Sequence, residues 1–412
     1  MELRIGMEAL SLRNFRTLDD VDVRDKTVLV RVDINSPINP STGEIMSDFR
    51  IKAILDTLEE LNESKVVLLS HQGRPCKDDF TSLSKHASVL QSYLGERLRF
   101  VPDVMGPTAI NEIRNLKRGD ILLLDNVRLM AEEVAEASPQ TLANSLFVET
   151  LSKHLDLFVN DAFPCIHRSN ASMVGFPKHL PTAIGRLMEK ELDAVNKVLG
   201  HEMRKRVFLI GGAKPKDRVR VIKHILEAGV GECTFLLGGV IAKVFLVAAN
   251  VKIPESIRRE ITTYVDDLDI EEVRSLLGRY GEDIILPIDY AYEFHEVRIE
   301  DPIQYVDSGE TVYDIGSRTI KAYSRRMREA DLIFANGPLG YMEDPLFIRG
   351  TIETLKAIID LKGYKIVGGG HLSTLVEEEG ISDRFDHVST GGGSLLHLLS
   401  GEIPLSLKLL MK

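Results

Sequence analysis

Few cysteines and no excess of positive charge set the first limits on this sequence. Its 412 residues include only three cysteines, Cys76, Cys165 and Cys233. They are too few and too scattered for a disulfide framework or a zinc site, and they fit a reducing compartment. The 51 basic and 62 acidic residues give a formal net charge of −11. Because a nucleic-acid-binding surface must neutralise phosphates with basic residues, this balance argues against nucleic acid as a partner.

Long apolar runs are also missing. The best candidate for a membrane span, Thr234–Asn250, is short and is interrupted by Gly238-Gly239 and Lys243. Residues 1–20 alternate charged and apolar side chains without the apolar core of a signal peptide. We therefore expect a soluble, cytoplasmic, globular protein that has no membrane partner. No feature of the sequence points to an obligate protein partner.

Short apolar runs, in contrast, recur along the whole chain. A length of 412 residues with 44% apolar content suits two hydrophobic cores. Most runs are nearly continuous in Val, Ile, Leu and Phe, as in strands of a parallel sheet that is covered on both faces. The runs are Val28–Ile34, Val66–Leu69, Ile121–Leu124, Leu157–Val159, Val207–Ile210, Thr234–Leu237, Ile284–Ile288, Leu332–Ala335, Lys365–Val367 and His387–Val388. The predicted class is α/β, with two doubly wound, Rossmann-like parallel-sheet domains.

Segments with helical spacing lie between the runs. The clearest are Arg50–Leu61, Val219–Glu227, Thr319–Arg328 and Phe347–Asp360. A longer one, Thr182–Gly200, ends in glycine and is predicted to be one helix that joins two domains. We place these domains at residues 1–185 and 186–412 and expect a cleft between them. The C-terminal tail is a candidate to pack back on the first domain.

Polar residues follow the first four apolar runs. In open α/β sheets, ligands bind beyond the carboxyl ends of the strands, so these residues should meet at one edge. The residues at this edge are Asp33, Asn35, His71, Arg74, Arg128 and Arg168, with Arg50 opening the next helix. Any one arginine could form an ordinary surface salt bridge, but the whole set favours a pocket for phosphate and carboxylate groups. Asp33 could either orient Arg50 or accept a hydrogen bond from a ligand hydroxyl.

Glycines follow the apolar runs of the second half. They let backbone N–H groups approach a ligand, and the helix start that follows favours phosphate. The segments are Gly211-Gly212-Ala213-Lys214, Gly238-Gly239, Asn336-Gly337-Pro338, Gly368-Gly369-Gly370 and Gly391-Gly392-Gly393. Each alone is common without a ligand, whereas several on one sheet favour a nucleotide platform. Neither a Walker A loop nor a dinucleotide fingerprint is present. Lys214 and Arg218, four residues apart, could share a helix face toward phosphate or be solvated helix charges.

An anion pocket on one domain and a nucleotide platform on the other suggest phosphoryl transfer by an enzyme that closes between its domains. At these residues the sequence closely resembles the phosphoglycerate kinase family, in order and over nearly the whole chain. The matching segments are RVDIN (31–35), SHQGRP (70–75), DNVR (125–128), VNDAF (159–163), HRSNAS (167–172), LMEKEL (187–192), GGAK (211–214), NGP (336–338) and VSTGGG (388–393).

The resemblance implies reversible phosphoryl transfer between 1,3-bisphosphoglycerate with ADP and 3-phosphoglycerate with ATP, as in glycolysis and gluconeogenesis, with Mg²⁺ accompanying the nucleotide. It implies that Arg50, Lys214, Gly392 and Gly393 are catalytic. The 3-phosphoglycerate ligands would be Asp33, Asn35, Arg50, His71, Arg74, Arg128 and Arg168. The nucleotide ligands would be Gly212, Lys214, Arg218, Gly238, Gly239, Asn336, Pro338, Glu343, Gly369, Gly370, His371 and Ser373. Within that set, Glu343 would bind the ribose and Asn336 the phosphates.

Two departures from the family pattern bear on chemistry. Arg218 stands where the family commonly has lysine, which keeps the charge but changes the donor geometry. His371 stands where many members have an aspartate that holds the nucleotide magnesium, so the resemblance leaves the metal ligands open. Cys165, beside the anion set, could be a reactive thiol or a packed residue.

Two other functions compete with this interpretation. One is an α/β kinase with a different acceptor, such as a carbamate or an acyl phosphate, which would not need the anion set of the first domain. The other is a two-domain binding protein without turnover, against which Arg50, Lys214 and the glycine turn at 391–393 argue.

Overall fold

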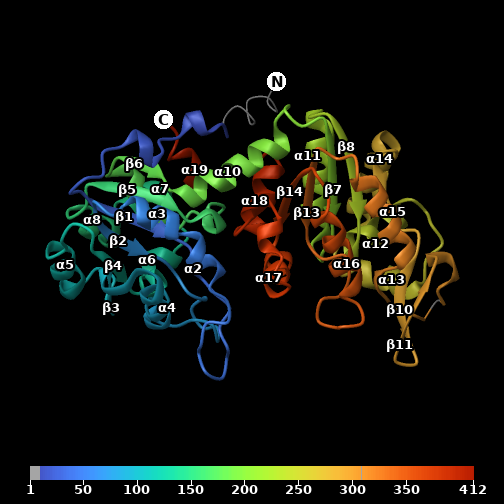
Figure 1. Cartoon of the computed structure of the whole chain (residues 1–412), viewed down its shortest axis with the longest axis horizontal. Helices are drawn as coiled ribbons and strands as arrows, with labels where there is room; N and C mark the ends of the chain where they lie inside the picture. Colours follow the sequence, from blue (N-terminus) through green and yellow to red (C-terminus); the bar gives the residue numbers. More distant parts are fainter. Residues whose placement is uncertain (1–9, 308) are drawn as a thin grey trace. The chain divides into compact units, whose positions relative to one another are not determined.

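The computed structural model describes residues 10–307 and 309–412, which form two compact units (Figure 1). The N-terminal unit runs from residue 10 to Asp193 and includes Ile403–Lys412, and the C-terminal unit comprises Ala194–Glu402. The division between them falls inside helix α10 (Arg186–Leu199). The predicted boundary at residues 185 and 186 stays a prediction. No helix in the described residues is long and apolar enough to cross a membrane.

The N-terminal unit is built on a six-stranded parallel sheet with the order β3-β4-β2-β1-β5-β6. Its strands are β1 (Thr27–Val32), β2 (Lys65–Leu69), β3 (Leu98–Val101), β4 (Ile121–Leu124), β5 (Leu157–Asp161) and β6 (Thr182–Ile184). Its helices are α2 (Phe49–Ala53), α3 (Leu55–Glu60), α4 (Ser84–Leu94), α5 (Pro107–Arg114), α6 (Ala131–Val134), α7 (Pro139–Ala143), α8 (Leu146–Ser152), α9 (Ala171–Val174), α19 (Leu405–Lys408) and the first part of α10. The apolar runs of β1, β2 and β4 are buried, and they form the centre of the core.

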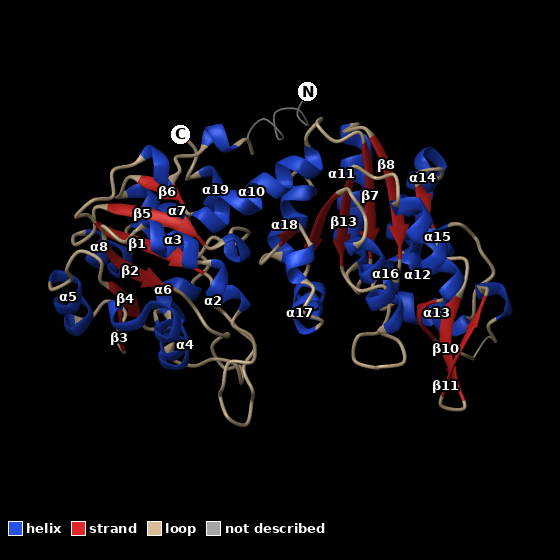
Figure 2. Cartoon of the chain, viewed as in Figure 1, coloured by secondary structure: helices blue, strands red, loops and turns tan. Residues whose placement is uncertain are grey.

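The C-terminal unit contains a second six-stranded parallel sheet, in the order β15-β14-β13-β7-β8-β9. Its strands are β7 (Lys205–Ile210), β8 (Glu232–Leu237), β9 (Ile284–Ile285), β13 (Leu332–Asn336), β14 (Tyr364–Gly368) and β15 (His387–Val388). Its helices are α11 (Pro215–Ala228), α12 (Gly239–Ala248), α13 (Glu255–Ile261), α14 (Asp267–Tyr280), α15 (Ser317–Met327), α16 (Arg349–Ile359), α17 (Gly370–Glu378) and α18 (Gly392–Leu399), besides the end of α10. Figure 2 shows strands and helices alternating in both units. The predicted α/β class with two doubly wound parallel sheets is confirmed.

Three strands of the C-terminal unit form an antiparallel sheet of their own, with the order β11-β10-β12. They are β10 (Tyr290–Phe294), β11 (Val297–Asp301) and β12 (Val312–Ile315). The pattern of apolar runs does not predict this sheet, because β11 is polar and only partly buried and therefore lacks a continuous apolar run.

Two predicted helices need correction. The segment Thr182–Gly200 is not one helix: Thr182–Ile184 forms the edge strand β6, and α10 begins only at Arg186. Thr and Ile are β-branched, and they pair with the end of β5. The segment Arg50–Leu61 is divided into α2 and α3 by Ile54, which caps both.

The start of α10 is anchored in the N-terminal unit by Asp161. One carboxylate oxygen accepts a hydrogen bond from the Met188 N–H at 2.9 Å, and the other accepts one from the Thr57 hydroxyl at 2.6 Å. A Cβ atom on Gly185 would lie 2.4 Å from this carboxylate, so glycine is required there. The side chain of Arg186 then pairs with Asp19, Glu60 and Glu189.

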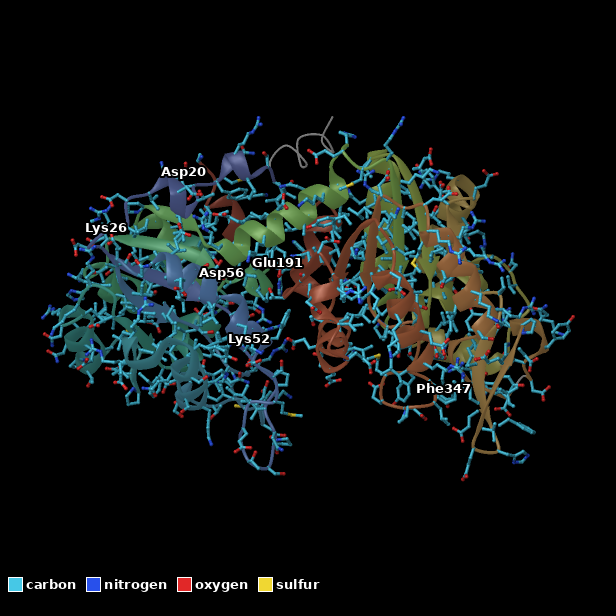
Figure 3. The ribbon with its side chains drawn as sticks, viewed as in Figure 1. Asp20, Lys26, Lys52, Asp56, Glu191 and Phe347 are labelled. Carbon is cyan, nitrogen blue, oxygen red and sulfur yellow. The ribbon has the colours of Figure 1, made fainter. Side chains whose placement is uncertain are left out.

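The C-terminal residues complete the N-terminal unit. The Ser406 hydroxyl in α19 donates a hydrogen bond to the Ile166 carbonyl, and the Lys412 N–H donates to the Asn14 carbonyl at 2.7 Å. The Lys412 ammonium lies 3.4 Å from the carboxylate of Asp20, which Figure 3 labels on this unit. The last residues of the chain therefore pack on this unit and contact its first described segment at Asn14 and Asp20.

Candidate active-site residues

The predicted anion residues follow four neighbouring strands of the N-terminal sheet. These strands, β4, β2, β1 and β5, are parallel and adjacent, so their carboxyl ends lie along one edge. Asp33 and Asn35 follow β1, and His71 follows β2. Arg128 lies in the 3₁₀ turn after β4, and Arg168 lies in the segment after β5. Arg50 is the second residue of α2, after the loop that follows β1.

Asp33 lies at the centre of these residues and is 3% exposed. Its carboxylate is 3.2 Å from Arg50 Nη1, and the same nitrogen donates to the Asn35 carbonyl at 3.1 Å. Burial alone would raise the pKa of Asp33, but Arg50, His71, the Asn35 N–H and Arg31 outweigh it and hold the pKa below its usual value. Asp33 is therefore ionised and orients Arg50, which is one of the two roles predicted for it.

His71 is buried next to Asp33, with 4.0 Å between Nδ1 and the nearer carboxylate oxygen. Burial lowers its pKa well below the usual value despite the attraction of Asp33, and Arg31, Arg128 and Arg168 lower it further. The imidazole is therefore neutral at physiological pH. A neutral histidine beside several guanidinium groups can serve as a hydrogen-bond donor without adding to the positive charge.

Two more arginines lie near His71. The Arg128 guanidinium donates to the carbonyl of Gly73, whose own N–H donates to the Asn35 side chain at 2.8 Å. Burial lowers the pKa of Arg128, and the neighbouring charge of Arg168 lowers it further. Guanidinium groups that repel each other at a sheet edge are stabilised when an anion binds between them. Arg74 differs from the others, because it lies in the exposed loop after β2.

Gly73 has a structural reason to be glycine. Its φ of +64° lies in the left-handed region, and a Cβ atom would lie 2.2 Å from the Asp79 carbonyl oxygen. This tight turn directs its carbonyl toward Arg128 and its N–H toward Asn35. The turn thereby connects the residues that follow β1, β2 and β4.

Cys165 is buried beneath the same residues. Its Sγ donates to the Asp33 carboxylate at 3.3 Å, and burial raises the pKa of the thiol to about 12. The thiol is therefore protonated at neutral pH, which favours the prediction of a packed residue over a reactive one.

Asp33, His71 and Cys165 also form the one group of three possible metal ligands in the described residues, with ligand atoms within 4.8 Å of one another. Arg31 and Arg50 contact this group at 3.3 Å and 3.2 Å. Four arginine charges that act on these residues disfavour a cation and favour an anion.

The glycines predicted to bind nucleotide lie along one edge of the C-terminal sheet. They follow the adjacent strands β15, β14, β13, β7 and β8. The Gly211 N–H donates to the Asn336 carbonyl at 2.9 Å, and the Gly212 N–H donates to the Pro338 carbonyl at 2.7 Å. The Gly238 N–H donates to the Ile210 carbonyl at 2.9 Å. These bonds join the turns after β7, β8 and β13.

Not every glycine at this edge is required by packing. A Cβ atom on Gly392 would lie 2.5 Å from the Gly369 Cα atom, so close contact between the two turns requires glycine there. A Cβ atom on Gly370 or Gly393 would meet nothing within 4 Å in the described residues. These two glycines lie in the first turns of α17 and α18, where free N–H groups and the helix dipole favour phosphate.

Asn336 is a buried polar residue at this edge. Its side chain is fully buried, yet neither its amide nitrogen nor its amide oxygen has a hydrogen-bond partner among the described residues. Leaving a buried amide unsatisfied costs about 1–3 kcal/mol. The amide lies beside the glycine turn after β14: a Cβ atom on Gly369 would be 3.6 Å from the Asn336 nitrogen. A phosphate or a water at this turn would satisfy it.

Lys214 and Arg218 do not share an exposed helix face. Lys214 is the exposed N-cap residue of α11. Arg218 is 9% exposed and turns back into the β7–α11 turn, where its Nε donates to the Gly211 carbonyl at 3.1 Å. Burial lowers the pKa of Arg218. Arg218 therefore supports the glycine turn, and Lys214 extends from it into solvent.

The remaining predicted nucleotide ligands differ in exposure. Ser373 is buried, and its hydroxyl donates to the Ser389 carbonyl at 2.9 Å, which ties α17 to the end of β15. His371 lies exposed in the first turn of α17. Glu343 is exposed in the segment between β13 and α16, which carries Phe347, labelled in Figure 3, at its end. Gly239 begins α12 with a φ of +57°.

The side chains at the glycine edge of the C-terminal sheet do not form a set of ligands suited to Mg²⁺. Mg²⁺ prefers hard oxygen ligands, above all carboxylates, and imidazole suits softer metals. The glycine edge offers the imidazole of His371 and no cluster of three possible ligands within the described residues.

Three further polar residues near the site, Arg31, Glu133 and Ser172, are not among the residues predicted from the sequence. All three are buried and connected to His71 or to one another. The available signal was the charged residue inside the apolar strand Thr27–Val32.

Two doubly wound parallel sheets, one with arginines at its carboxyl edge and the other with glycine turns, define the class of a two-domain phosphotransferase. A profile of the family described as "Phosphoglycerate kinase" matches residues 18–402. A phosphoglycerate kinase of Methanothermus fervidus is 41% identical over 390 residues, which cover 94% of this chain and 95% of the relative. One of Archaeoglobus fulgidus is 42% identical over 386 residues, covering 94% of each.

Solved structures agree. The crystal structure of phosphoglycerate kinase from Pyrococcus horikoshii matches with a TM-score of 0.87 and 34% identity, and the match covers 96% of this chain and 98% of that one. The structure of the enzyme from Coxiella burnetii matches with a TM-score of 0.78 and 27% identity, with the same coverage. The chain belongs to the phosphoglycerate kinase family, and it is a kinase that uses a nucleotide.

Proposed function

We propose that this enzyme transfers a phosphoryl group reversibly between 1,3-bisphosphoglycerate with ADP and 3-phosphoglycerate with ATP. The observation that carries this proposal is the set of cationic and donor side chains around Asp33. Arg50, His71, Arg128 and Arg168 lie at the ends of adjacent strands, and electrostatic interactions connect several of them. A small acid with both a phosphate and a carboxylate group requires several such donors.

In the direction of ATP use, a carboxylate oxygen of the acid attacks the terminal phosphorus of ATP, and the bond from that phosphorus to the ADP oxygen breaks. Arg50 would neutralise negative charge at the attacking carboxylate, held in place by Asp33. His71, Arg128 and Arg168 would hold the acid, together with Asn35 and Arg74. Such chemistry depends on positioning and charge compensation, and it requires no covalent intermediate with the protein.

At the glycine edge, Lys214 and the N–H groups of Gly392 and Gly393 would stabilise the transferring phosphoryl group. Gly212, Gly238, Gly239 and Pro338 would surround the base, and Glu343 would bind the ribose. Asn336, Gly369, Gly370, His371, Ser373 and Arg218 would complete the phosphate end, with the buried amide of Asn336 as the supporting observation. Magnesium would arrive with the nucleotide and be held by phosphate oxygens and water, because the side chains at this edge do not form a site for it.

We further propose that the two units close on the reactants, which would exclude water from the transfer. A cytoplasmic location fits the three cysteines, all of which are free. No nucleic acid, membrane or obligate protein partner is required for this reaction.

A coupled assay with ATP and 3-phosphoglycerate tests the proposal. The expected result is turnover that depends on both, and acetate or carbamate in place of 3-phosphoglycerate should give little or none. Preferred turnover with carbamate or a simple acyl acceptor would establish the alternative kinase. Tight binding of both ligands without turnover would establish a binding protein.

A further inference from the structure

Arg31 is a charged residue inside the buried strand β1. It is 1% exposed, although its neighbours along the strand are Val30 and Val32. Its Nε donates to the Ser172 hydroxyl at 2.8 Å, and its Nη1 donates to the carbonyls of Val32 and Leu69, the latter at 3.4 Å. A guanidinium group with three of its nitrogen–hydrogen bonds occupied in this way has a fixed orientation.

Glu133 and Ser172 hold Arg31 from the other side. Glu133 is 1% exposed and accepts hydrogen bonds from both the N–H and the hydroxyl of Ser172, each at 2.8 Å. Its carboxylate lies 3.9 Å from Arg31 Nη2 and offers the charge that a buried arginine requires. Burial raises the pKa of Glu133, while Arg31 and Ser172 act in the opposite direction.

The free end of Arg31 reaches His71, with 3.3 Å between Arg31 Nη2 and His71 Nδ1. A guanidinium group can only donate, so Nδ1 must accept and cannot carry a proton. No other group near Nδ1 is a good acceptor for a proton on it: the Asp33 oxygen is too distant for a hydrogen bond at 4.0 Å, and the Cys165 sulfur, whose single proton is donated to Asp33, is only a weak acceptor at 4.0 Å. Because the imidazole is neutral, its single proton must reside on Nε2.

We infer that Arg31 is a positioning residue that fixes His71 as the neutral Nε2–H tautomer, so that Nε2 donates a hydrogen bond to an oxygen of the bound acid. Within the described residues, no group accepts a hydrogen bond from Nε2. Nε2 is not one of the fully buried polar atoms without a partner, so it keeps some exposure to solvent. It therefore remains available to a ligand. The inference rests on the proposed function for the identity of the acid, whereas the tautomer follows from the protein alone.

Nitrogen NMR of the full chain labelled with ¹⁵N-histidine tests this inference directly. Two-bond correlations from the ring protons distinguish a protonated ring nitrogen from an unprotonated one, and loss of signals in His71→Gln assigns them. In the wild type, His71 Nδ1 should be unprotonated and Nε2 protonated. In Arg31→Lys, which keeps a donor, this pattern should persist. In Arg31→Met/Glu133→Gln, which removes both buried charges together, the pattern should change to a mixture of tautomers.

The same double variant should raise the KM for 3-phosphoglycerate about tenfold, with a smaller change in kcat and in the KM for ATP. Arg31→Lys should largely restore the KM. His86 is an internal spectral reference, because its Nε2 is hydrogen-bonded to the Gln72 side chain and its NMR signals should not change in these variants. Arg206→Met is the matched control, since Arg206 is equally buried at 1% exposure but lies in the other unit, and it should leave both KM and the His71 signals unaltered.

A protonated Nδ1 on His71 in the wild type would overturn the inference. So would a double variant that folds with an unchanged His71 pattern and unchanged KM. Absence of turnover with 3-phosphoglycerate would reject the proposed function instead, and the NMR result would still decide the tautomer.

Discussion

The Arg50 guanidinium lies 3.2 Å from the Asp33 carboxylate, and this pair links a helix start to the end of a buried strand. The two partners differ in exposure: the side chain of Asp33 is 2% exposed and that of Arg50 is 28% exposed. The buried carboxylate therefore fixes the arginine while part of the guanidinium remains accessible to a ligand. Because a buried carboxylate without a partner is costly, removing Arg50 affects Asp33 as well.

Arg50→Ala should lower kcat by about 10³-fold or more while changing the KM for 3-phosphoglycerate much less. The reason is that a positioned cation at a transferring phosphoryl group acts mainly on the transition state. Steady-state kinetics with both substrates varied provide the measurement.

Lys52→Ala is the matched control for this variant. Lys52 lies on the same helix, is labelled in Figure 3, and pairs with Asp48 at 2.9 Å at an exposed position. Its removal should leave kcat unchanged. A near-normal kcat in Arg50→Ala with only a raised KM would remove Arg50 from the catalytic role.

Asn336→Leu should weaken ADP binding by at least tenfold without destabilising the free protein. Leucine has a similar size, and it removes a buried amide whose two polar atoms lack partners in the described chain. The free energy of unfolding without ligand should stay constant or rise by about 1–3 kcal/mol. Calorimetric titration with ADP and denaturant unfolding measure the two effects.

Asn126→Leu provides the contrast. The Asn126 side chain is equally buried, but its nitrogen donates to the carbonyls of Gln72 and Thr81, each at 2.8 Å. This variant should lower the free energy of unfolding and leave ADP affinity unaltered. Destabilisation of Asn336→Leu comparable to that of Asn126→Leu would show that the Asn336 amide is satisfied within the protein.

Parallel strands could be predicted from sequence because burial on both faces makes them continuously apolar. The run at Ile121–Leu124 coincides with β4, all of whose residues are buried. The run at His387–Val388 coincides with β15, but this edge strand is only partly buried, so burial on both faces does not explain its prediction. The hairpin of β10 and β11 could not be predicted in this way, since its exposed residues, such as Phe294 and Val297, alternate with charged ones. The sequence predicts helix for the three residues of β6 because only Gly185 separates them from the helical spacing of α10.

The candidate site could be predicted to the extent that sheet topology determines it. The order of the parallel strands places the residues that follow β1, β2, β4 and β5 at one edge, and this placement does not depend on the orientation of their side chains. Side-chain direction could not be predicted: Arg218 turns back because the Gly211 carbonyl accepts its hydrogen bond. The link from Arg31 to His71 was equally hidden, because Glu133 and Ser172, which hold it, come from distant segments.

Stability at alkaline pH should fall because of Cys165. The pKa of its thiol is about 12 in the folded protein, against 9.0 for an ordinary cysteine, so the folded chain retains a proton that the unfolded chain loses. The unfolded state therefore binds fewer protons as pH rises from 9 toward 12, and the free energy of unfolding decreases by up to ~1.4 kcal/mol per pH unit. Denaturant unfolding of the wild type and Cys165→Ala, compared across this range, isolates the contribution.

Thiol labelling offers a second readout of the same burial. Cys76 is exposed, whereas Cys165 and Cys233 are buried. At neutral pH, iodoacetamide should modify one cysteine in the folded protein, Cys76, and all three after denaturation. Rapid modification of Cys165 in the folded protein, or an alkaline stability loss that persists in full in Cys165→Ala, would contradict this account.

Domain closure predicts a change in size upon binding both substrates. Small-angle X-ray scattering should show a smaller radius of gyration with 3-phosphoglycerate and a nucleotide together than with either alone, because only the pair supplies contacts to both units. Arg50→Ala bound to both substrates tests whether this arginine contributes to closure. An unchanged radius with both ligands would reject closure as the proposed step.

The role of His371 can be tested by restoring a carboxylate. Imidazole is a poor ligand for Mg²⁺, so the ion should be held by nucleotide oxygens and water, and His371→Ala should leave the magnesium dependence of ADP binding nearly unchanged. His371→Asp places a hard oxygen ligand in the first turn of α17, and it should bind ADP more tightly when Mg²⁺ is present. Titration of ADP at several magnesium concentrations measures both variants.

Thr374→Asp separates coordination from general electrostatics. Thr374 is exposed on the same helix, so this control adds the same charge to α17 outside its first turn. A gain confined to His371→Asp, and present only with Mg²⁺, would show that the carboxylate contacts the ion. Equal gains in both variants would indicate a long-range charge effect, and a large loss of magnesium dependence in His371→Ala would show that the histidine itself is a ligand. Since a new carboxylate without metal should repel the nucleotide phosphates, His371→Asp should bind metal-free ADP more weakly than the wild type does.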